Sequence, residues 1–385
     1  MLRVYDTAKR EVIPFEAVEP GRVSIYSCGP TVYGSPHIGH GRFALAWDIF
    51  RRYLEWLGYE VTFASNITDV DDKIIARANR EGRSWSDVAA QYEDEWYTAM
   101  DGIGVRRPDH APRASEYIGR MVDLIADLQE RGYAYETSDG VYMAVDRVPG
   151  YGVLAPGPID ALLAGARVEV VEEKRSPRDF ALWKKAKPGE PTWDSPWGPG
   201  RPGWHTECVA MSLDLLGDAF DVHVGGMDLR FPHHENERAQ AVALGKGFSR
   251  FWMHNGFLEV EGVKMSKSLD NFSDLQDLID EGEPRAYRLL LLQSHYRAPI
   301  EVSKETVAQA ASALGRLDAF ATRVAEAGLA GDVEPDPATI DRFRERMDDD
   351  LDTPGATALI FDAVRRANRA LDAGDKERAA ALAAA

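Results

Sequence analysis

The sequence has only two cysteines, Cys28 and Cys208, among its 385 residues. Two thiols cannot form the disulfide framework of a secreted scaffold, so we expect a reduced, cytoplasmic protein. Long hydrophobic runs are also missing, because runs such as Leu289–Leu292 and Ala379–Ala385 are far shorter than a membrane span. The N-terminus shows no basic start followed by an apolar stretch, so we expect neither a secretory signal nor a membrane partner.

Positive charge is scarce as well. The chain has 45 lysines and arginines against 63 aspartates and glutamates, a net charge of −18. A nucleic-acid partner would therefore have to meet a local basic patch, because the body of the protein is acidic. One such patch has six basic residues against Asp179: Lys174, Arg175, Arg178, Lys184, Lys185 and Lys187. It is either a solvated face or a phosphate contact.

The remaining composition is that of a globular protein, with 44% hydrophobic and 28% charged residues. Near the start, Val23–Tyr26 resembles a short strand and Glu60–Ala64 a second one. Between them, apolar residues from Phe43 to Leu57 recur mostly at steps of three and four, which indicates one face of a helix. This βαβ order predicts an α/β fold with a parallel sheet that binds ligands at the carboxyl ends of its strands.

The rest of the chain changes character several times. The pattern is helical over about 84–132, short strands with six prolines follow, and sheet-like sequence returns at Phe220–Val224 before a helix from about Glu235. After Pro299 the chain is almost wholly helical. We expect five segments: the first half of a nucleotide-binding core (1–132), a connecting insertion (133–200), the second half of the core (201–250), a segment with a lysine-serine loop (251–303) and a helical bundle (304–385).

One apparent nucleotide motif is excluded by its context. Gly198–Gly203 matches the pattern G-x-G-x-x-G letter for letter. However, no apolar strand precedes it, and two prolines stand where a dinucleotide site needs free backbone N–H groups. The sequence therefore does not predict a dinucleotide site there.

Two other motifs fit phosphate chemistry. His37-Ile38-Gly39-His40 lies at the predicted strand-to-helix junction, where phosphate oxygens can approach the backbone and a protonated histidine can neutralise developing charge. Lys264-Met265-Ser266-Lys267-Ser268 places two lysines and two hydroxyls on one short loop, which suits a clamp on pyrophosphate. Each motif alone is weak evidence, whereas both together in a βαβ context are specific.

The two motifs resemble the HIGH and KMSKS signatures of class I aminoacyl-tRNA synthetases, and the chain as a whole is similar to the cysteinyl-tRNA synthetases from Met1 to about Leu371. The matching stretches are Cys28–Tyr33 (CGPTVY), Asn66–Lys73 (NITDVDDK), Gly200–Cys208 (GRPGWHTEC) and Phe231–Glu237 (FPHHENE). The resemblance implies a Rossmann-like class I catalytic core with an inserted connecting domain and a C-terminal helical bundle.

A metal site can be argued from the residues themselves. Cys28, Cys208, His233 and Glu237 offer sulfur, nitrogen and oxygen ligands that suit one tetrahedral Zn²⁺. His233 and Glu237 are four residues apart, so on a helix their side chains point the same way. The alternative is two buried structural cysteines beside a surface segment, and His234 competes with His233 for the imidazole position. In the family that the chain resembles, the four positions hold zinc.

The resemblance also implies an ATP site and a cysteine pocket. The ATP site would comprise His37, Gly39, His40, Gly225, Gly226, Asp228 and Lys267. The cysteine pocket would comprise Gly29, Thr68 and Trp204. Asp228 would hold ribose hydroxyls, although a plain glycine turn remains the alternative, and Thr68 and Trp204 could equally belong to the core. We expect His205 and His254 to be structural.

These residues imply a cysteine–tRNA ligase reaction with L-cysteine, ATP with Mg²⁺, and tRNA(Cys) as partners. The cysteine carboxylate would attack the α-phosphorus of ATP, and the tRNA ribose hydroxyl would then take the cysteinyl group. The catalytic residues would be His37, His40, Lys264 and Lys267. Zinc would bind the substrate's sulfur and so separate cysteine from serine, which a cavity alone cannot do by the required ~10⁴-fold.

The acceptor remains open at the level of sequence. Bacterial members of the family continue into a small anticodon-reading domain, whereas this chain ends at Ala385 inside or just after the predicted bundle. Either the sequence represents a truncated form, or the protein does not read an anticodon. A related ligase of mycothiol biosynthesis uses the same apparatus to join cysteine to an amino-sugar inositol, and this is the alternative function. A non-enzymatic nucleic-acid-binding paralogue is disfavoured by the intact motifs. We expect a monomer.

Overall fold

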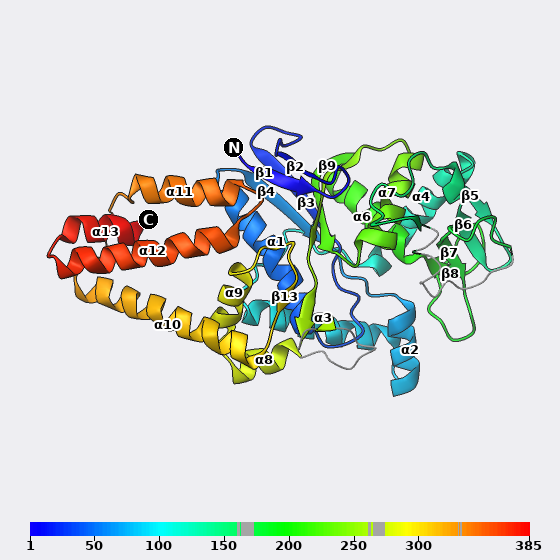
Figure 1. The fold of residues 1–385 in the computed structure, drawn as a ribbon. Coiled ribbons are helices and arrows are strands. Elements are labelled where there is room, and N and C mark those ends of the chain that lie inside the picture. Colours follow the sequence, from blue (N-terminus) through cyan, green and yellow to red (C-terminus); the bar gives the residue numbers. More distant parts are fainter. Residues whose placement is uncertain (160–161, 163–172, 261–262, 265–273, 330, 332) are drawn as a thin grey trace.

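The computed structural model describes residues 1–159, 162, 173–260, 263–264, 274–329, 331 and 333–385. Figure 1 shows a central sheet with a small second sheet on the right and a bundle of long helices on the left. Lys267, a predicted catalytic residue, lies outside the described residues. None of the described helices is long and apolar enough to cross a membrane.

The central sheet has four strands in the order β10-β9-β3-β4, and all of its pairings are parallel. The strands are β3 (Arg22–Ser27), β4 (Glu60–Ser65), β9 (Ala219–Gly226) and β10 (Phe248–Asn255). Helix α1 (Ile38–Trp56) connects β3 to β4. The α/β class with a parallel sheet is therefore confirmed, and the helix begins before the first apolar residue of its periodic run, at Ile38.

Apolar side chains cover both faces of this sheet, as expected for parallel strands between helices. Neighbouring residues alternate between two cores: Ile25 and Phe251 pack in the core that contains α1, whereas Tyr26 and Trp252 pack on the other side. That other side is covered by α6 (Trp204–Leu216) and α7 (Glu235–Ala243). Because helices seal both faces, ligands can reach the sheet only at its ends.

The connecting insertion contains a second sheet, which is antiparallel and has the order β5-β6-β7-β8. Its strands are β5 (Ala134–Glu136), β6 (Gly140–Met143), β7 (Ala181–Lys185) and β8 (Gly200–Pro202). The G-x-G-x-x-G match falls on β8 and the residues beside it, where Gly203 directly precedes α6.

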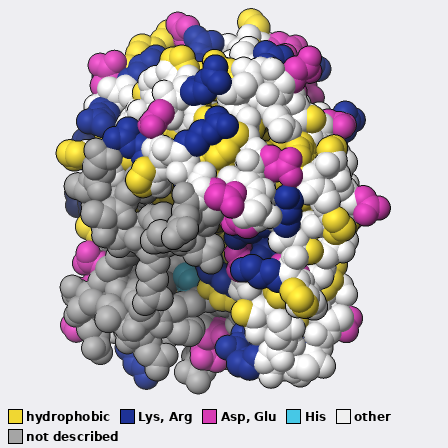
Figure 2. All heavy atoms as spheres, turned by 90° about the vertical axis from the view of Figure 1, so that its right-hand side faces the viewer, with side chains coloured by type: hydrophobic (Ala, Val, Ile, Leu, Met, Phe, Trp, Pro, Cys, Tyr) yellow, Lys and Arg dark blue, Asp and Glu magenta, His cyan; other side chains and the backbone are white. Residues whose placement is uncertain are grey.

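Part of the predicted basic patch is paired within the protein. Lys184 forms an ion pair with Asp72 at 2.6 Å and Lys185 one with Glu136 at 2.9 Å. Figure 2 shows the face on this side of the molecule, where lysine and arginine side chains lie interspersed with acidic ones. The charge of this segment is therefore partly neutralised by its own neighbours.

The remaining elements surround the central sheet. A hairpin is formed by β1 (Arg3–Asp6) and β2 (Glu11–Pro14), and a three-stranded sheet by β11 (Leu258–Val260), β12 (Val263–Lys264) and β13 (Ile300–Glu301). The other helices before the bundle are α2 (Asp72–Glu81), α3 (Trp85–Gly102), α4 (Ile118–Glu130), α8 (Leu275–Glu281) and α9 (Pro284–Leu292). The helices of the bundle are α10 (Lys304–Glu326), α11 (Pro337–Asp348), α12 (Thr353–Asp372) and α13 (Lys376–Ala384). The helical character predicted after Pro299 is thus present, apart from the short β13.

Substitution of Phe50 tests how much the buried side chains of α1 contribute to the stability of the protein. Phe50 is fully buried, and its ring lies edge-on to Phe15 at 6.3 Å between centroids. We expect Phe50→Ala to lower the free energy of unfolding by about 3–5 kcal/mol, because a large buried ring leaves a cavity. Ile360→Ala, at a side chain that is 44% exposed, should change it by less than about 0.5 kcal/mol. Denaturant unfolding compares the two, and equal losses would contradict the assignment of Phe50 to the core.

Candidate active site

A cavity of about 580 Å³ opens at the carboxyl ends of the parallel strands. The loop after β3, the N-terminus of α1 and the ends of β9 and β10 surround it. The residues that line it include eight that sequence analysis selected: Cys28, Gly29, His37, Gly39, His40, Trp204, Gly226 and Asp228. One cavity therefore brings together residues from both halves of the predicted core.

The two histidines of the first motif form one wall of this cavity. Their rings are stacked, with 3.7 Å between centroids and an interplanar angle of 15°. The backbone N–H of His37 donates a hydrogen bond to Nδ1 of His40 at 3.1 Å, and the His40 ring also meets Trp96 edge-on at 5.5 Å. The positive end of the α1 dipole and two imidazoles thus face the same space, which suits an anionic ligand.

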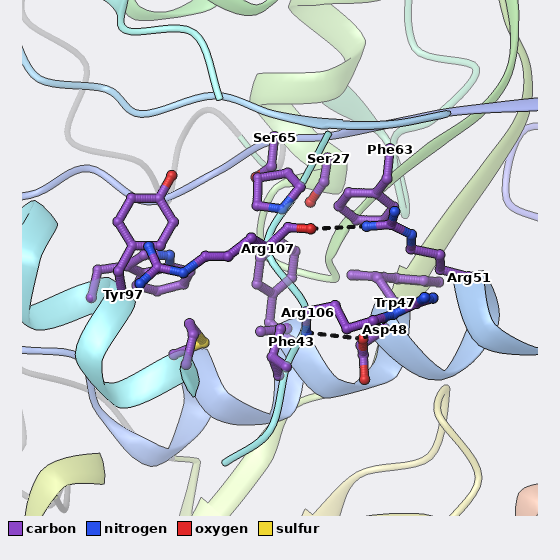
Figure 3. Close-up of a pocket in the computed structure, with 15 residues that line it drawn as sticks. Ser27, Phe43, Trp47, Asp48, Arg51, Phe63, Ser65, Tyr97, Arg106 and Arg107 are labelled. Carbon is purple, nitrogen blue, oxygen red and sulfur yellow. Dashed lines mark hydrogen bonds and ion pairs between the residues drawn. The ribbon is translucent and has the colours of Figure 1, made fainter. Parts of the chain in front are cut away.

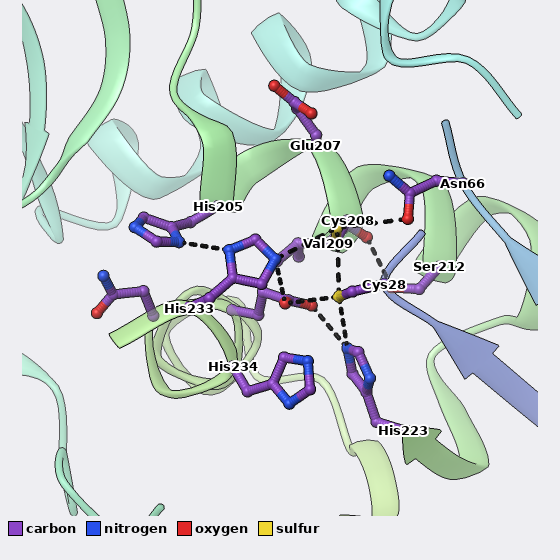
Figure 4. Close-up of polar contacts among 12 residues, drawn as sticks. Cys28, Asn66, His205, Glu207, Cys208, Val209, Ser212, His223, His233 and His234 are labelled. Atoms are coloured by element: carbon purple, nitrogen blue, oxygen red, sulfur yellow. Dashed lines mark hydrogen bonds and ion pairs between the residues drawn. The ribbon is translucent and has the colours of Figure 1, made fainter. Parts of the chain in front are cut away.

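A cluster of sulfur, nitrogen and oxygen atoms lies at another boundary of the cavity (Figure 4). Cys28 follows β3, Cys208 lies in α6, His233 lies in the turn before α7, and Glu237 lies one helical turn further on. Their ligand atoms all lie within 4.8 Å of one another. The structure therefore brings together the four residues that sequence analysis selected as metal ligands.

The distances within the cluster match a tetrahedral site. Sγ of Cys28 is 3.5 Å from Sγ of Cys208 and 3.2 Å from Oε1 of Glu237. Nε2 of His233 is 3.6 Å from Sγ of Cys208 and 3.0 Å from Oε1 of Glu237. Donor atoms at the zinc–sulfur and zinc–nitrogen bond lengths stand about 3.3–3.8 Å apart on a tetrahedron. Little movement would therefore be needed to bind zinc.

Burial favours the neutral form of most of these groups. It raises the pKa of the Cys28 thiol well above its ordinary value and that of Cys208 to about 11, and the nearby Glu237 carboxylate also raises both. Burial likewise lowers the pKa of the His233 imidazole, which keeps it neutral. A divalent cation would reverse the preference of the thiols, since it stabilises thiolate ligands directly.

His223 belongs to the same cluster, and sequence analysis missed it. Its Nε2 lies 2.7 Å from Oε2 of Glu237 and 3.9 Å from Sγ of Cys28. A second ligand set is therefore geometrically possible, made of Cys28, His223, His234 and Glu237. In the sheet His223 pairs with Tyr26 of β3, two residues before Cys28, a register between distant segments that the sequence pattern does not show.

The two histidines that we expected to be structural, His205 and His254, contact the imidazole rings of His233 and His234. Nδ1 of His205 lies 2.9 Å from Nδ1 of His233, a position that would orient the His233 ring toward a metal. His254 lies 2.8 Å from both Nδ1 of His234 and the hydroxyl of Thr7. The contact with His254 occupies Nδ1 of His234. Nε2 of His233, by contrast, faces Cys208 and Glu237.

The predicted cysteine-pocket residues are not all at the cavity. Trp204 stacks on His233 at 4.0 Å between centroids and lines the cavity. Gly29 packs so closely that an added Cβ would lie 1.7 Å from the carbonyl oxygen of Asn66. Thr68, by contrast, is buried and donates its hydroxyl to Oε2 of Glu207 at 3.0 Å, and it does not line the cavity.

The predicted nucleotide residues lie at the end of β9 and beyond it. Gly226 and Asp228 line the cavity, whereas Gly225 lies against the ring of His234 and outside the lining. Lys264 lies in β12, in the three-stranded sheet next to the cavity.

A second cavity, of about 50 Å³, lies on the other side of Phe43 and Trp96, two residues that line both spaces. Figure 3 shows it beside α1, where Arg51 donates a hydrogen bond to the backbone carbonyl of Arg107 at 2.9 Å. Its volume suits a few water molecules and is too small for a nucleotide.

Comparison with known proteins assigns the fold to one class. The family described as "tRNA synthetases class I (C) catalytic domain" matches residues 14–312, and the DALR domain matches residues 342–385. The structure is similar to methionyl-tRNA synthetase of Mycobacterium tuberculosis in complex with methionyl-adenylate, with a TM-score of 0.72 and 16% identity over 94% of this chain and 88% of that chain. The fold is therefore that of a class I tRNA synthetase.

Proteins with similar sequences show which family of class I tRNA synthetases the chain belongs to. The curated Cysteine–tRNA ligase of Thermodesulfovibrio yellowstonii is 46% identical over 96% of this chain and 80% of its own length. The Cysteine–tRNA ligase of Streptomyces avermitilis is 48% identical over 99% of this chain and 81% of its own length. This chain belongs to the cysteine–tRNA ligase family of class I tRNA synthetases.

Cys208→Ser tests whether the cluster binds metal. A hydroxyl is a much poorer zinc ligand than a thiolate, so we expect the variant to bind zinc at least about tenfold more weakly than the unchanged protein. Metal analysis after dialysis against a graded chelator measures this. Ser212→Ala is the matched control, because Ser212 is buried one turn further along α6 and bonds only to the carbonyl of Val209 among described partners. Equal zinc retention in both variants would exclude Cys208 as a ligand.

Proposed function

We propose that this protein is a cysteine–tRNA ligase, which forms cysteinyl-adenylate from L-cysteine and ATP and transfers the cysteinyl group to tRNA(Cys), releasing AMP and pyrophosphate. The single observation that carries this proposal is the shared cavity. Cys28 of the sulfur-containing cluster and His37 and His40 of α1 line the same space. A sulfur-recognising site and a phosphate-binding helix end can therefore act on one substrate pair. The curated relatives add support through their names.

Substrate selection would depend on Cys28, Cys208, His233 and Glu237 holding one zinc ion. Zinc would supply a ligand position that prefers the thiolate of cysteine to the hydroxyl of serine. His205 would orient His233 from behind through its 2.9 Å contact. Trp204, stacked on His233 and 36% exposed, would cover the substrate from the solvent side.

Activation would take place at the N-terminus of α1. The cysteine carboxylate oxygen attacks the α-phosphorus of the Mg²⁺–ATP complex, the new oxygen–phosphorus bond forms, and the bond to pyrophosphate breaks. His37, His40 and the helix amides would stabilise the charge that develops on the phosphorus oxygens. Lys264 and Lys267 would hold the pyrophosphate, with Gly39 contributing backbone to the phosphate site. Gly225, Gly226 and Asp228 would hold the nucleoside.

Transfer would complete the reaction without a covalent enzyme intermediate. The terminal ribose hydroxyl of tRNA attacks the carbonyl carbon of the adenylate, and AMP leaves with the electron pair of the broken bond. The amino-sugar inositol acceptor of the alternative function would attack the same carbon through its amine. The relatives' names favour tRNA.

We also propose that the chain is organised as its sequence suggests, with a catalytic core split by the insertion 133–200, a segment 251–303 that carries the second motif, and a bundle from 304. Strands β5 to β8 fall within or at the end of the insertion, and helices α10 to α13 lie in the bundle. This arrangement would leave the carboxyl edge of the central sheet open to both the acceptor and ATP.

Acceptor choice tests the function directly. The purified protein, with cysteine, ATP and Mg²⁺ held constant, is offered tRNA(Cys) in one reaction and an amino-sugar inositol in another. We expect cysteinyl-tRNA to form and the sugar to remain unmodified, because the relatives are tRNA ligases. Ligation to the sugar alone would replace tRNA charging by the alternative function. Absence of cysteine-dependent pyrophosphate exchange would overturn both.

Lys267→Ala separates activation from substrate binding. If Lys267 holds pyrophosphate in the transition state, the variant should lose roughly 10²–10³-fold in the rate of cysteine-dependent ATP–pyrophosphate exchange. The dissociation constant of cysteine, measured by calorimetry, should change by less than about twofold, because a contact made only in the transition state does not affect binding of the substrate. Parallel losses in both measurements would contradict a role in the transition state.

A further inference from the structure

Arg42 is a buried cation at the cavity that the function above does not use. It lies in α1 two residues after His40, it is only 4% exposed, and it lines the cavity. Burial lowers its pKa to about 10, so the guanidinium still carries its charge at neutral pH. Among the residues that the structure describes, no carboxylate forms an ion pair with it.

The partners of Arg42 are main-chain carbonyl groups. Its Nη1 donates to the carbonyl oxygen of Phe257 at 2.7 Å, and its Nη2 donates to that of Tyr296 at 3.2 Å and to that of Ala298. These residues lie more than 200 positions from Arg42 in the sequence. One side chain therefore joins α1 to two separate backbone segments.

The two backbone segments flank the sheet that carries Lys264. Phe257 directly precedes β11, and Ala298 lies just before β13. Strand β11 pairs with β13 on one side and, on the other, with β12, where Glu259 is opposite Lys264. Arg42 thus joins the residues that precede β11 and β13 to α1, the helix whose N-terminus carries His37 and His40.

The contact between these segments leaves little room for movement. The backbone N–H of Gly256 donates to the carbonyl of Tyr296 at 2.8 Å. An added Cβ on Gly256 would lie 2.5 Å from the carbonyl oxygen of Arg297 and 2.6 Å from that of Ala298. The N-terminus of α1 is also bonded to α9, where the hydroxyl of Tyr287 donates to the carbonyl of Ile38 at 2.5 Å.

We propose that Arg42 is a positioning residue for the activation step, which fixes the distance between the α1 N-terminus and the sheet that bears Lys264. This inference rests on the proposed function, in which the two parts bind the same triphosphate. Misplacement of catalytic groups by about 1 Å can cost about 10²-fold in rate. A planar guanidinium with several donors in fixed directions can bind three carbonyls at once, whereas a lysine ammonium cannot hold this geometry.

Arg42→Lys tests the proposal, with Arg51→Lys as the matched control. Arg51 is a second buried arginine of α1 that also donates to a main-chain carbonyl, that of Arg107, but it lines the small cavity (Figure 3). It also forms ion pairs with Glu55 and Asp109. Cysteine-dependent ATP–pyrophosphate exchange gives kcat and the KM of each substrate. Zinc content and the thermal unfolding midpoint are measured on the same samples.

We expect Arg42→Lys to lose roughly 10–100-fold in kcat, with the KM for cysteine and the zinc content unchanged within about twofold. Arg51→Lys should lower the unfolding midpoint to a similar extent and keep its kcat. A kcat for Arg42→Lys near that of the unchanged protein, or equal loss of kcat in both variants, would overturn the proposal. If the unchanged protein shows no exchange, the proposed function itself fails first, and the role of Arg42 falls with it.

Tyr287→Phe keeps the proposal testable if Arg42→Lys does not fold. This change removes the hydroxyl that bonds to Ile38 and leaves the buried ring in place. Since the N-terminus of α1 is then held less tightly by α9, we expect a severalfold fall in kcat with unchanged zinc content. An unchanged kcat would count against positioning of α1 by this junction.

Discussion

The candidate active site depends on one constraint: two thiols, an imidazole and a carboxylate are buried in contact with one another. Cys28, Cys208, His233 and Glu237 are nearly or fully buried, with ligand atoms within 4.8 Å of one another. Charged groups at such a position are costly unless a counter-charge is present. Each ligand comes from a different part of the fold: the end of β3, the helix α6, the turn before α7 and α7 itself. A bound cation would therefore both satisfy these groups and join four segments.

The parallel sheet determines where this cluster can meet a nucleotide. Its faces are sealed by α1 on one side and by α6 and α7 on the other, so access is left at the strand ends. At the carboxyl edge the chain leaves β3 through Cys28 and Gly29 and enters α1 at Ile38. The loop between them is ten residues long (28–37) and thus supplies both the first sulfur ligand and the helix N-terminus.

Sequence could predict those features that depend on local spacing. The strands near residues 23–26 and 60–64 and the helix between them follow from apolar periodicity, and the shared direction of His233 and Glu237 follows from their separation by four. The start of α1 at Ile38 agrees with the strand-to-helix junction predicted at His37–His40, whereas the periodic apolar residues begin only at Phe43. His223 and the carbonyl partners of Arg42 depend on tertiary packing between distant segments, which periodicity does not record.

The choice of carbonyl partners for Arg42 has an electrostatic consequence. A carboxylate at the same distance would neutralise the guanidinium. Arg42 would then still hold the two segments together, but it would add no net positive charge at the cavity. Carbonyl oxygens carry only partial charges, so they compensate for burial through hydrogen bonds while the net positive charge remains. In a site of low dielectric beside the stacked His37 and His40, that charge favours the phosphates of a nucleotide. The same three hydrogen bonds that join α1 to the two backbone segments thus leave one uncompensated positive charge at the cavity, within a chain whose net charge is −18.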